Sequence, residues 1–128
     1  MLPEPERLRK SSEFGYTYNL KRSVATSLLI LYTGKLKNSL ETSPRVGFVV
    51  GKKVHKRANK RNYIKRLMRE AYRNIKKTTK IPINQWETLI FIARPNILEV
   101  DYKEVYDNIV ECLRKANKRY GNPDLMGN

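Results

Sequence analysis

The 128-residue sequence has little of what several classes of protein need. Its one cysteine, Cys112, excludes a disulfide within the chain and fits a reducing compartment. No apolar run is long enough to cross a bilayer, and residues 1–10 lack the apolar core of a signal peptide. We therefore expect a cytoplasmic protein with no membrane partner.

Acidic residues are also scarce, at 12 against 27 lysines and arginines, which gives a formal net charge of +15. The imbalance is concentrated in residues 52–77, which hold twelve basic residues and one acid, Glu70. Because such a charge repels itself, it indicates a polyanionic partner: nucleic acid first, and an anionic membrane surface second. An ordinary solvated helix face is disfavoured, since it would include acids to form ion pairs.

The apolar pattern predicts a single α+β domain over residues 1–128, with an ordered core at about 7–119. Segments with strand character alternate with segments of helical periodicity, and no repeat or second domain is evident. The predicted strands lie within 23–33, which can hold two, and at 45–52 and 88–94, and the predicted helices lie at about 11–20, 64–75 and 102–118.

The basic segment also contains a regular apolar pattern. Its members recur three or four residues apart and, at about 100° per residue, fall within about 60° of Ile64. They are Ile64, Leu67, Met68, Ala71 and Ile75. Most basic residues fall on the opposite face, so the segment predicts a helix packed on a core with a cationic outer surface. Charge alone does not distinguish RNA from DNA as its partner.

Residues for catalysis are missing as well. The one histidine, His55, lies in a basic loop that would repel a metal cation, and Cys112 lies on the apolar stripe of the last predicted helix. No pair of acids stands apart as a general acid and base. The sequence therefore predicts a binding protein with no catalytic residue, metal ligand or cofactor of its own.

The stretch ANKRNYIKRLMRE, at 58–70, resembles the RNR signature of the bacterial ribonuclease P protein component, approximately A-x-x-R-N-x-x-K-R-x-x-R-E. The matching positions are Ala58, Arg61, Asn62, Lys65, Arg66, Arg69 and Glu70. The segments RLRKSSEF, RVGFVVGKKV and TLIFIARP are also similar to segments of this family, so the resemblance spans about residues 7–116. The family pattern has a glycine soon after the paired lysines, where this chain has His55.

The resemblance implies a two-layer sandwich of a mixed, mainly antiparallel sheet with helices, in which the basic helix forms a left-handed βαβ crossover. It implies the protein subunit of ribonuclease P, an endoribonuclease ribonucleoprotein that removes the 5′ leader of precursor tRNA. In that family the catalytic RNA carries out the chemistry and holds the Mg²⁺ ions. The alternative is a ribosomal or general RNA-binding module. A DNA-binding protein is a weaker alternative, and we expect no DNA partner.

The resemblance also assigns residues to two binding surfaces. One contacts the catalytic RNA, and the other is a cleft for the precursor tRNA leader, between the sheet and the first helix. The predicted RNA-binding residues are Lys52, Lys53, Lys60, Arg61, Asn62, Lys65, Arg66 and Arg69, and the predicted leader-cleft residues are Phe14, Tyr18 and Tyr32.

Overall fold

The structure is a computed structural model that describes residues 6–37 and 39–122. A 3₁₀ helix that the sequence pattern did not predict, η2 (Pro95–Glu99), links the last strand to the last helix. The other elements, in chain order, are α1 (Ser11–Asn19), β1 (Ser23–Ala25), β2 (Leu29–Thr33), β3 (Arg45–Val49), α2 (Ala58–Thr78), β4 (Thr88–Ala93) and α3 (Tyr102–Tyr120). Each predicted helix and strand is present, and the apolar segment within 23–33 does form two strands.

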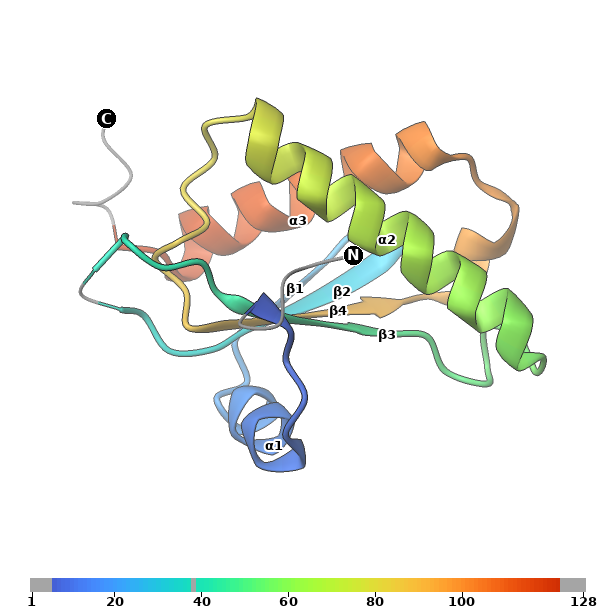
Figure 1. Cartoon of the computed structure of the whole chain (residues 1–128), viewed down its shortest axis with the longest axis horizontal. Helices are drawn as coiled ribbons and strands as arrows, with labels where there is room; N and C mark the ends of the chain where they lie inside the picture. Colours follow the sequence, from blue (N-terminus) through green and yellow to red (C-terminus); the bar gives the residue numbers. More distant parts are fainter. Residues whose placement is uncertain (1–5, 38, 123–128) are drawn as a thin grey trace.

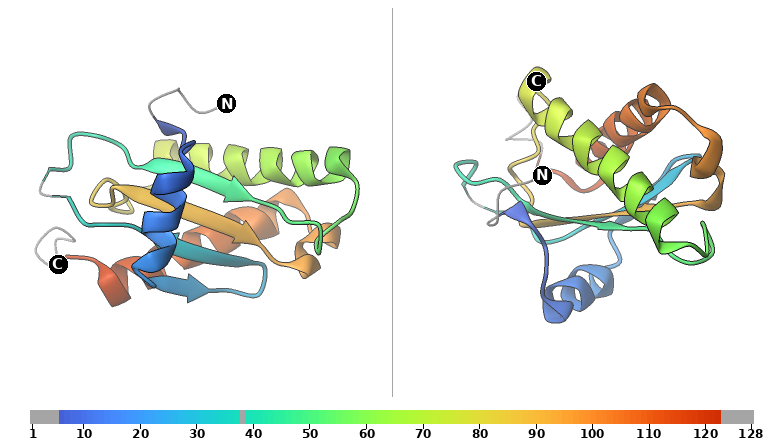
Figure 2. Two further views of the ribbon diagram at one scale, coloured as in Figure 1. Left: turned by 90° about the horizontal axis from the view of Figure 1, so that it is seen from below. Right: turned by 45° about the vertical axis from the view of Figure 1, so that its right-hand side comes forward.

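The four strands form one sheet in the order β1-β2-β4-β3. β2 pairs antiparallel with β1 and β4, whereas β3 pairs parallel with β4, which confirms the predicted mixed sheet. The helix α2 connects the parallel pair. In the left view of Figure 2, β3 lies above β4, both run to the right, and α2 lies behind the sheet, so the crossover is left-handed. This hand is rare, because about 98% of such crossovers are right-handed.

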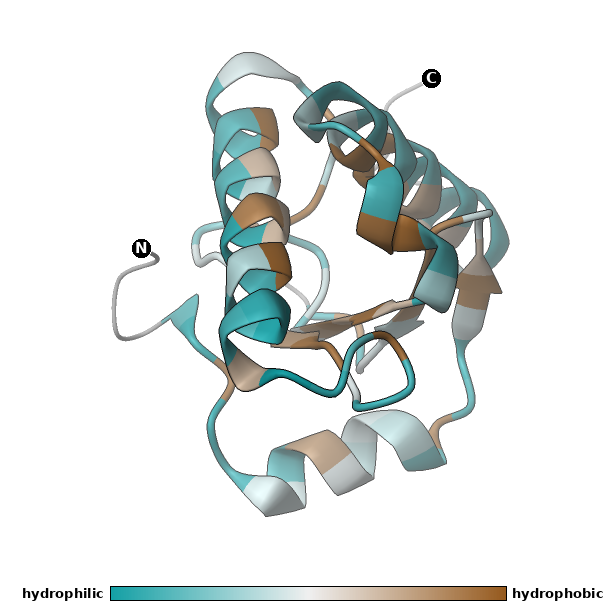
Figure 3. Cartoon of the chain, turned by 90° about the vertical axis from the view of Figure 1, so that its right-hand side faces the viewer, coloured by the Kyte–Doolittle hydropathy of each residue, from teal (hydrophilic) through white to brown (hydrophobic). Residues whose placement is uncertain are grey.

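The helices lie on both faces of the sheet. Figure 1 shows α2 and α3 on one face and α1 on the other. The apolar sides of α2 and α3 turn toward the sheet and toward each other (Figure 3), and the main core lies between them and the strands. Phe48 and Phe91 are cross-strand neighbours whose rings both contact the ring of Tyr72 on α2, with centroids 6.0 and 5.8 Å away.

The buried side of α2 is rotated slightly from the predicted one. Ile64, Met68, Ala71 and Ile75 are buried as predicted, but Leu67 is only half-buried, and Tyr72 is buried although it was not predicted. At about 100° per residue, Tyr72 lies about 80° from Ile64 on one side and Leu67 about 60° on the other. The helix turns toward Tyr72 because its ring packs on the two phenylalanines of the sheet.

The last helix buries one apolar stripe, and Cys112 lies on it as predicted. Asp101 accepts a hydrogen bond from the backbone N–H of Glu104 at 3.0 Å, so it caps the helix as its position suggests. Tyr102 and Tyr106, at the start of the apolar stripe, are only half-buried. The rest of the stripe is buried and consists of Val105, Ile109, Cys112, Leu113 and Ala116. Within the described residues, no helix combines the length and apolar content that crossing a membrane would require.

Candidate nucleic-acid interface

The outer face of α2 and the loop before it carry the predicted RNA-binding residues, all of them exposed or half-exposed. Most of them have side chains with no ion pair or hydrogen bond to the rest of residues 6–37 and 39–122. These are Lys52, Lys53, Lys60, Asn62, Lys65, Arg66 and Arg69. On α3, by contrast, Lys103 pairs with Asp107 at 2.8 Å and Lys115 pairs with Glu111 at 3.0 Å. The unpaired cations of α2 are therefore available to an external anion.

Arg61 is the exception, because its guanidinium binds the loop that precedes α2. Its Nη1 donates hydrogen bonds to the backbone carbonyls of His55, at 3.0 Å, and Lys56, at 2.7 Å. In the same loop, the Nδ1 of His55 accepts a hydrogen bond from the backbone N–H of Arg57 at 3.0 Å. These hydrogen bonds stabilise the loop although it has His55 where the family pattern has a glycine. Since a guanidinium has five N–H donors, Arg61 keeps others that could bind an external anion.

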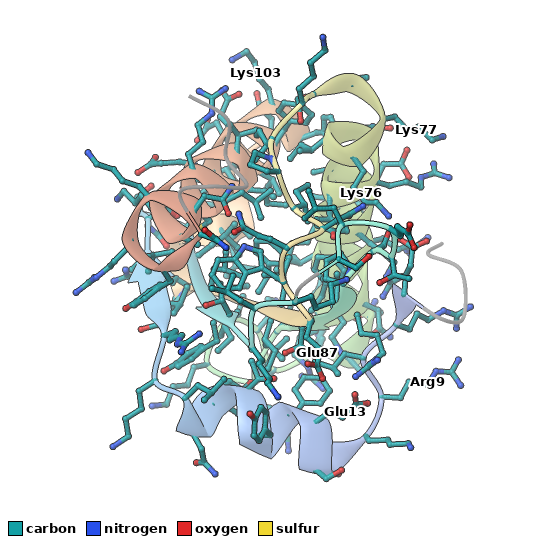
Figure 4. The ribbon with its side chains drawn as sticks, turned by 90° about the vertical axis from the view of Figure 1, so that its left-hand side faces the viewer. Arg9, Glu13, Lys76, Lys77, Glu87 and Lys103 are labelled. Atoms are coloured by element: carbon teal, nitrogen blue, oxygen red, sulfur yellow. The ribbon has the colours of Figure 1, made fainter. Side chains whose placement is uncertain are left out.

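In the second half of α2, two of the cations form hydrogen bonds and ion pairs within the protein. Arg73 donates to both carboxylate oxygens of Glu70, at 2.9 and 2.8 Å, and this hydrogen bonding holds the pKa of Glu70 below its usual value. Lys76 contacts the carboxylate of Glu6 and donates to the hydroxyl of Ser43. In Figure 4, Lys77 points away from the sheet. The unpaired charge is therefore concentrated in the first half of α2 and in the loop before it.

On the opposite face of the sheet, the structure brings the three predicted leader-cleft residues together. The rings of Phe14 and Tyr18 on α1 have centroids 6.3 Å apart, and Tyr18 meets Tyr32 of β2 edge-on at 5.0 Å. We refer to Phe14, Tyr18 and Tyr32 as the aromatic row. The pKa of Tyr18 is raised, mainly by burial and to a smaller extent by the nearby Tyr32. Its phenol therefore stays neutral near pH 7.

Three contacts that the sequence did not predict fix α1 against the sheet. The ring of Phe14 lies directly on the backbone of Gly47 in β3, where a Cβ would stand 2.7 Å from Cζ. The buried hydroxyls of Thr17 and Thr88 are 2.7 Å apart and share a hydrogen bond. At the start of α1, Arg45 binds Glu13, whose side chain Figure 4 shows close to that of Glu87. The position of the aromatic row is thus set by the sheet.

The sheet face beside the aromatic row is partly open. Figure 2 shows α1 crossing the strands and leaving the carboxyl ends of β3 and β4 uncovered. Val49, Ile92 and Ile30 occupy one cross-strand row there and are half-buried. A hollow of about 350 Å³ also lies beside α1, but Glu13 and Glu87 line it and the aromatic row does not. This apolar row lies next to the aromatic row, because Ile30 and Tyr32 are two residues apart on β2 and point to the same face. The exposed Lys52 and Lys53 follow β3.

Neither surface has the composition of a catalytic centre. In the part of the chain that the structure describes, no three His, Cys, Asp or Glu residues are grouped closely enough to hold a metal ion. Cys112 is buried in the core, where desolvation raises its pKa to about 12, so it remains a thiol. The chemistry available is therefore phosphate binding by cations and base stacking by aromatic rings.

Comparison with known proteins gives a consistent result. The family model for ribonuclease P matches residues 2–117. The chain belongs to the ribonuclease P protein family. The ribonuclease P protein component of Alkaliphilus oremlandii is 39% identical over 87% of this chain and 90% of its own length. That of Alkaliphilus metalliredigens is 38% identical over 85% of this chain and 91% of its own length.

Solved structures of ribonuclease P proteins share this fold. That of Staphylococcus aureus superposes with a TM-score of 0.68, at 28% identity, over 91% of this chain and 98% of the other. That of Thermotoga maritima gives a TM-score of 0.71, at 24% identity, over 86% and 96%. The α+β fold of this chain is therefore shared with solved ribonuclease P proteins.

Proposed function

We propose that this protein is the RNA-binding subunit of a bacterial ribonuclease P and promotes removal of the 5′ leader from precursor tRNA. It binds the catalytic RNA through α2 and the leader through the aromatic row. The catalytic RNA performs the hydrolysis and holds the Mg²⁺ ions, and the complex works in the cytoplasm. The observation that carries this proposal is the set of unpaired cations on α2 within a matching family signature.

The cations of α2 suit a folded RNA backbone. Because Lys65, Arg66 and Arg69 have no acidic partner among the described residues, binding a phosphate does not require breaking an internal ion pair. Each phosphate contact also releases condensed counterions from the RNA, which strengthens binding at low salt. An arginine can bind a phosphate through two parallel hydrogen bonds, which fixes its orientation as well as its distance.

The aromatic row suits a single strand. Bases of any sequence can stack on aromatic rings, at about 1–3 kcal/mol per base, and precursor leaders need such tolerance because they differ in sequence. The neutral phenol of Tyr18 adds no negative charge that would repel the backbone. Lys52 and Lys53, at the open end of β3, supply positive charge for the leader phosphates. The protein should therefore favour precursor tRNA over mature tRNA.

The test is leader removal at a magnesium concentration too low for the catalytic RNA alone. Adding the purified protein to the matching catalytic RNA and a precursor tRNA should raise the cleavage rate. No increase, in a preparation where the protein is folded, would contradict the proposal.

Leader length then separates the proposal from its alternatives. With the catalytic RNA present, shortening the leader of the precursor should weaken binding until its affinity equals that of mature tRNA. Indifference to the leader would instead support a ribosomal or general RNA-binding module. Effective competition by duplex DNA would support a DNA-binding protein.

A further inference from the structure

We propose that Tyr63, on one edge of α2, stacks on an unpaired base of the RNA bound by this helix, while Arg66 and Arg69 hold the neighbouring phosphates. The inference rests on the proposed function and specifies what α2 recognises. Tyr63 is not among the matching positions of the family signature, so neither the signature nor the charge pattern assigns it a role.

Tyr63 is unusual among the aromatic residues of the chain. It is 54% exposed, more than any other large hydrophobic residue that the structure describes. Across residues 6–37 and 39–122, its ring contacts no other aromatic ring and its hydroxyl has no hydrogen-bond partner. A single exposed apolar residue needs no explanation by itself, but the surroundings of Tyr63 are also unusual.

Tyr63 lies at a hollow in the surface of α2 with a volume of about 400 Å³. Leu67, one turn along, supplies a second apolar side chain, and Arg66 and Arg69 supply two unpaired cations. The one acid of the hollow, Glu70, is neutralised by its two hydrogen bonds to Arg73. The hollow is therefore apolar at one side and positive at the other.

The crossing of the helices explains why this edge of α2 is open. Positions 63, 67, 74 and 78 recur at helical spacing along the same edge. In the second half of α2, this edge is covered by α3: Asn74 donates to the Tyr102 hydroxyl at 2.6 Å, and Thr78 lies 3.2 Å from the Tyr106 hydroxyl. The start of α2 extends beyond α3 (Figure 1), so α3 does not cover the first turns of α2, where Tyr63 is exposed.

Charge complementarity favours an RNA base as the occupant. A nucleotide offers an aromatic face for Tyr63 and a phosphate for an arginine at a fixed separation, so one ligand satisfies both sides of the hollow. An apolar side chain of a protein partner would cover Tyr63 but leave Arg66 and Arg69 without an anion. A base within a duplex is already stacked on both faces, so the ligand is an unpaired base in a loop, bulge or joining strand.

The test is the affinity of the full protein for the matching catalytic RNA, without precursor tRNA, over a range of salt concentrations. Tyr63→Ala should weaken binding about tenfold, which corresponds to about 1.4 kcal/mol. The slope of affinity against salt should not change, because no phosphate contact is lost. Tyr63→Phe keeps the aromatic face and should bind within about twofold of the wild type.

The matched control is Tyr16→Ala, which removes a tyrosine that is 51% exposed on α1, on the opposite face of the sheet. It should leave the affinity for the catalytic RNA unchanged. Base-reactive chemical probing adds a direct measurement. An unpaired base should be protected by the wild type and by Tyr63→Phe, and should become reactive with Tyr63→Ala.

The outcomes separate this inference from the function on which it rests. If the wild type binds the catalytic RNA and Tyr63→Ala binds equally well, stacking by Tyr63 is refuted and the proposed function stands. If Tyr63→Phe loses as much affinity as Tyr63→Ala, the hydroxyl rather than the ring face makes the contact, and stacking is again refuted. If the wild type does not bind the catalytic RNA, the proposed function itself fails.

Discussion

Replacing Gly47 with alanine should disturb the aromatic row while leaving the unpaired cations of α2 intact. The new Cβ would stand 2.7 Å from Cζ and 2.9 Å from Cε1 of Phe14. Since carbon atoms pack at about 3.5 Å or more, the ring has to retreat by roughly 0.8 Å. Overpacking of this kind costs about 1–3 kcal/mol, and we expect that loss in the free energy of unfolding. Moving Phe14 also separates it from Tyr18, which shortens the aromatic row.

Two assays check this prediction for Gly47→Ala. Urea unfolding should show a lower midpoint with an unchanged slope, because the mutation alters packing and not the surface exposed on unfolding. Binding to the holoenzyme should weaken for precursor tRNA and not for mature tRNA. The control is Gly15→Ala on α1, where a Cβ meets nothing within 4 Å. It should stabilise the protein by about 0.5–1 kcal/mol through helix propensity. Wild-type stability and wild-type leader dependence in Gly47→Ala would refute the packing of Phe14 described above.

Two further substitutions test the loop and the core. Arg61→Lys keeps the charge but loses the guanidinium that donates to the carbonyls of His55 and Lys56, so binding of the catalytic RNA should weaken at an unchanged salt slope. Equal affinity in a salt titration would show that the loop does not depend on Arg61. Tyr72→Phe removes a buried hydroxyl that has no hydrogen-bond partner among the described residues, and should raise the free energy of unfolding by about 1 kcal/mol. A lower urea midpoint would show that the hydroxyl is satisfied.

Local sequence pattern was enough to predict every strand and α-helix of the fold, but not the 3₁₀ helix η2. Apolar residues alternate with other residues in the segment around β3, and they form a continuous run in the segment around β4. In α2 the apolar residues recur every three to four positions. Each of these elements is therefore specified by its own residues. The left-handed crossover was implied by the family signature and not by periodicity. Contacts between distant segments were not predictable in this way. Tyr72 replaces Leu67 in the core because of rings on two strands, and Thr17 meets Thr88 from 71 residues away.

The candidate site also has features that the sequence predicts and features that only the structure shows. The charge run and its signature located the cations of α2, because both are properties of contiguous residues. The sequence did not show which of these cations are free, since that depends on partners such as Glu6 for Lys76 and the loop carbonyls for Arg61. Nor did it show that Tyr63 is exposed, because the extent to which α3 covers α2 follows from the angle at which the two helices cross.

The central claim is that the unpaired cations of α2 bind RNA phosphates, and the salt dependence of binding tests it most directly. Affinity for the matching catalytic RNA should be measured for the wild type, for Arg66→Ala, and for Lys103→Ala as a control. Lys103 is an exposed cation on α3 that is already paired with Asp107. Arg66→Ala should reduce the slope of log affinity against log salt by about one unit, and Lys103→Ala should not change it. An unchanged slope in Arg66→Ala, or equal reductions in both variants, would contradict the claim.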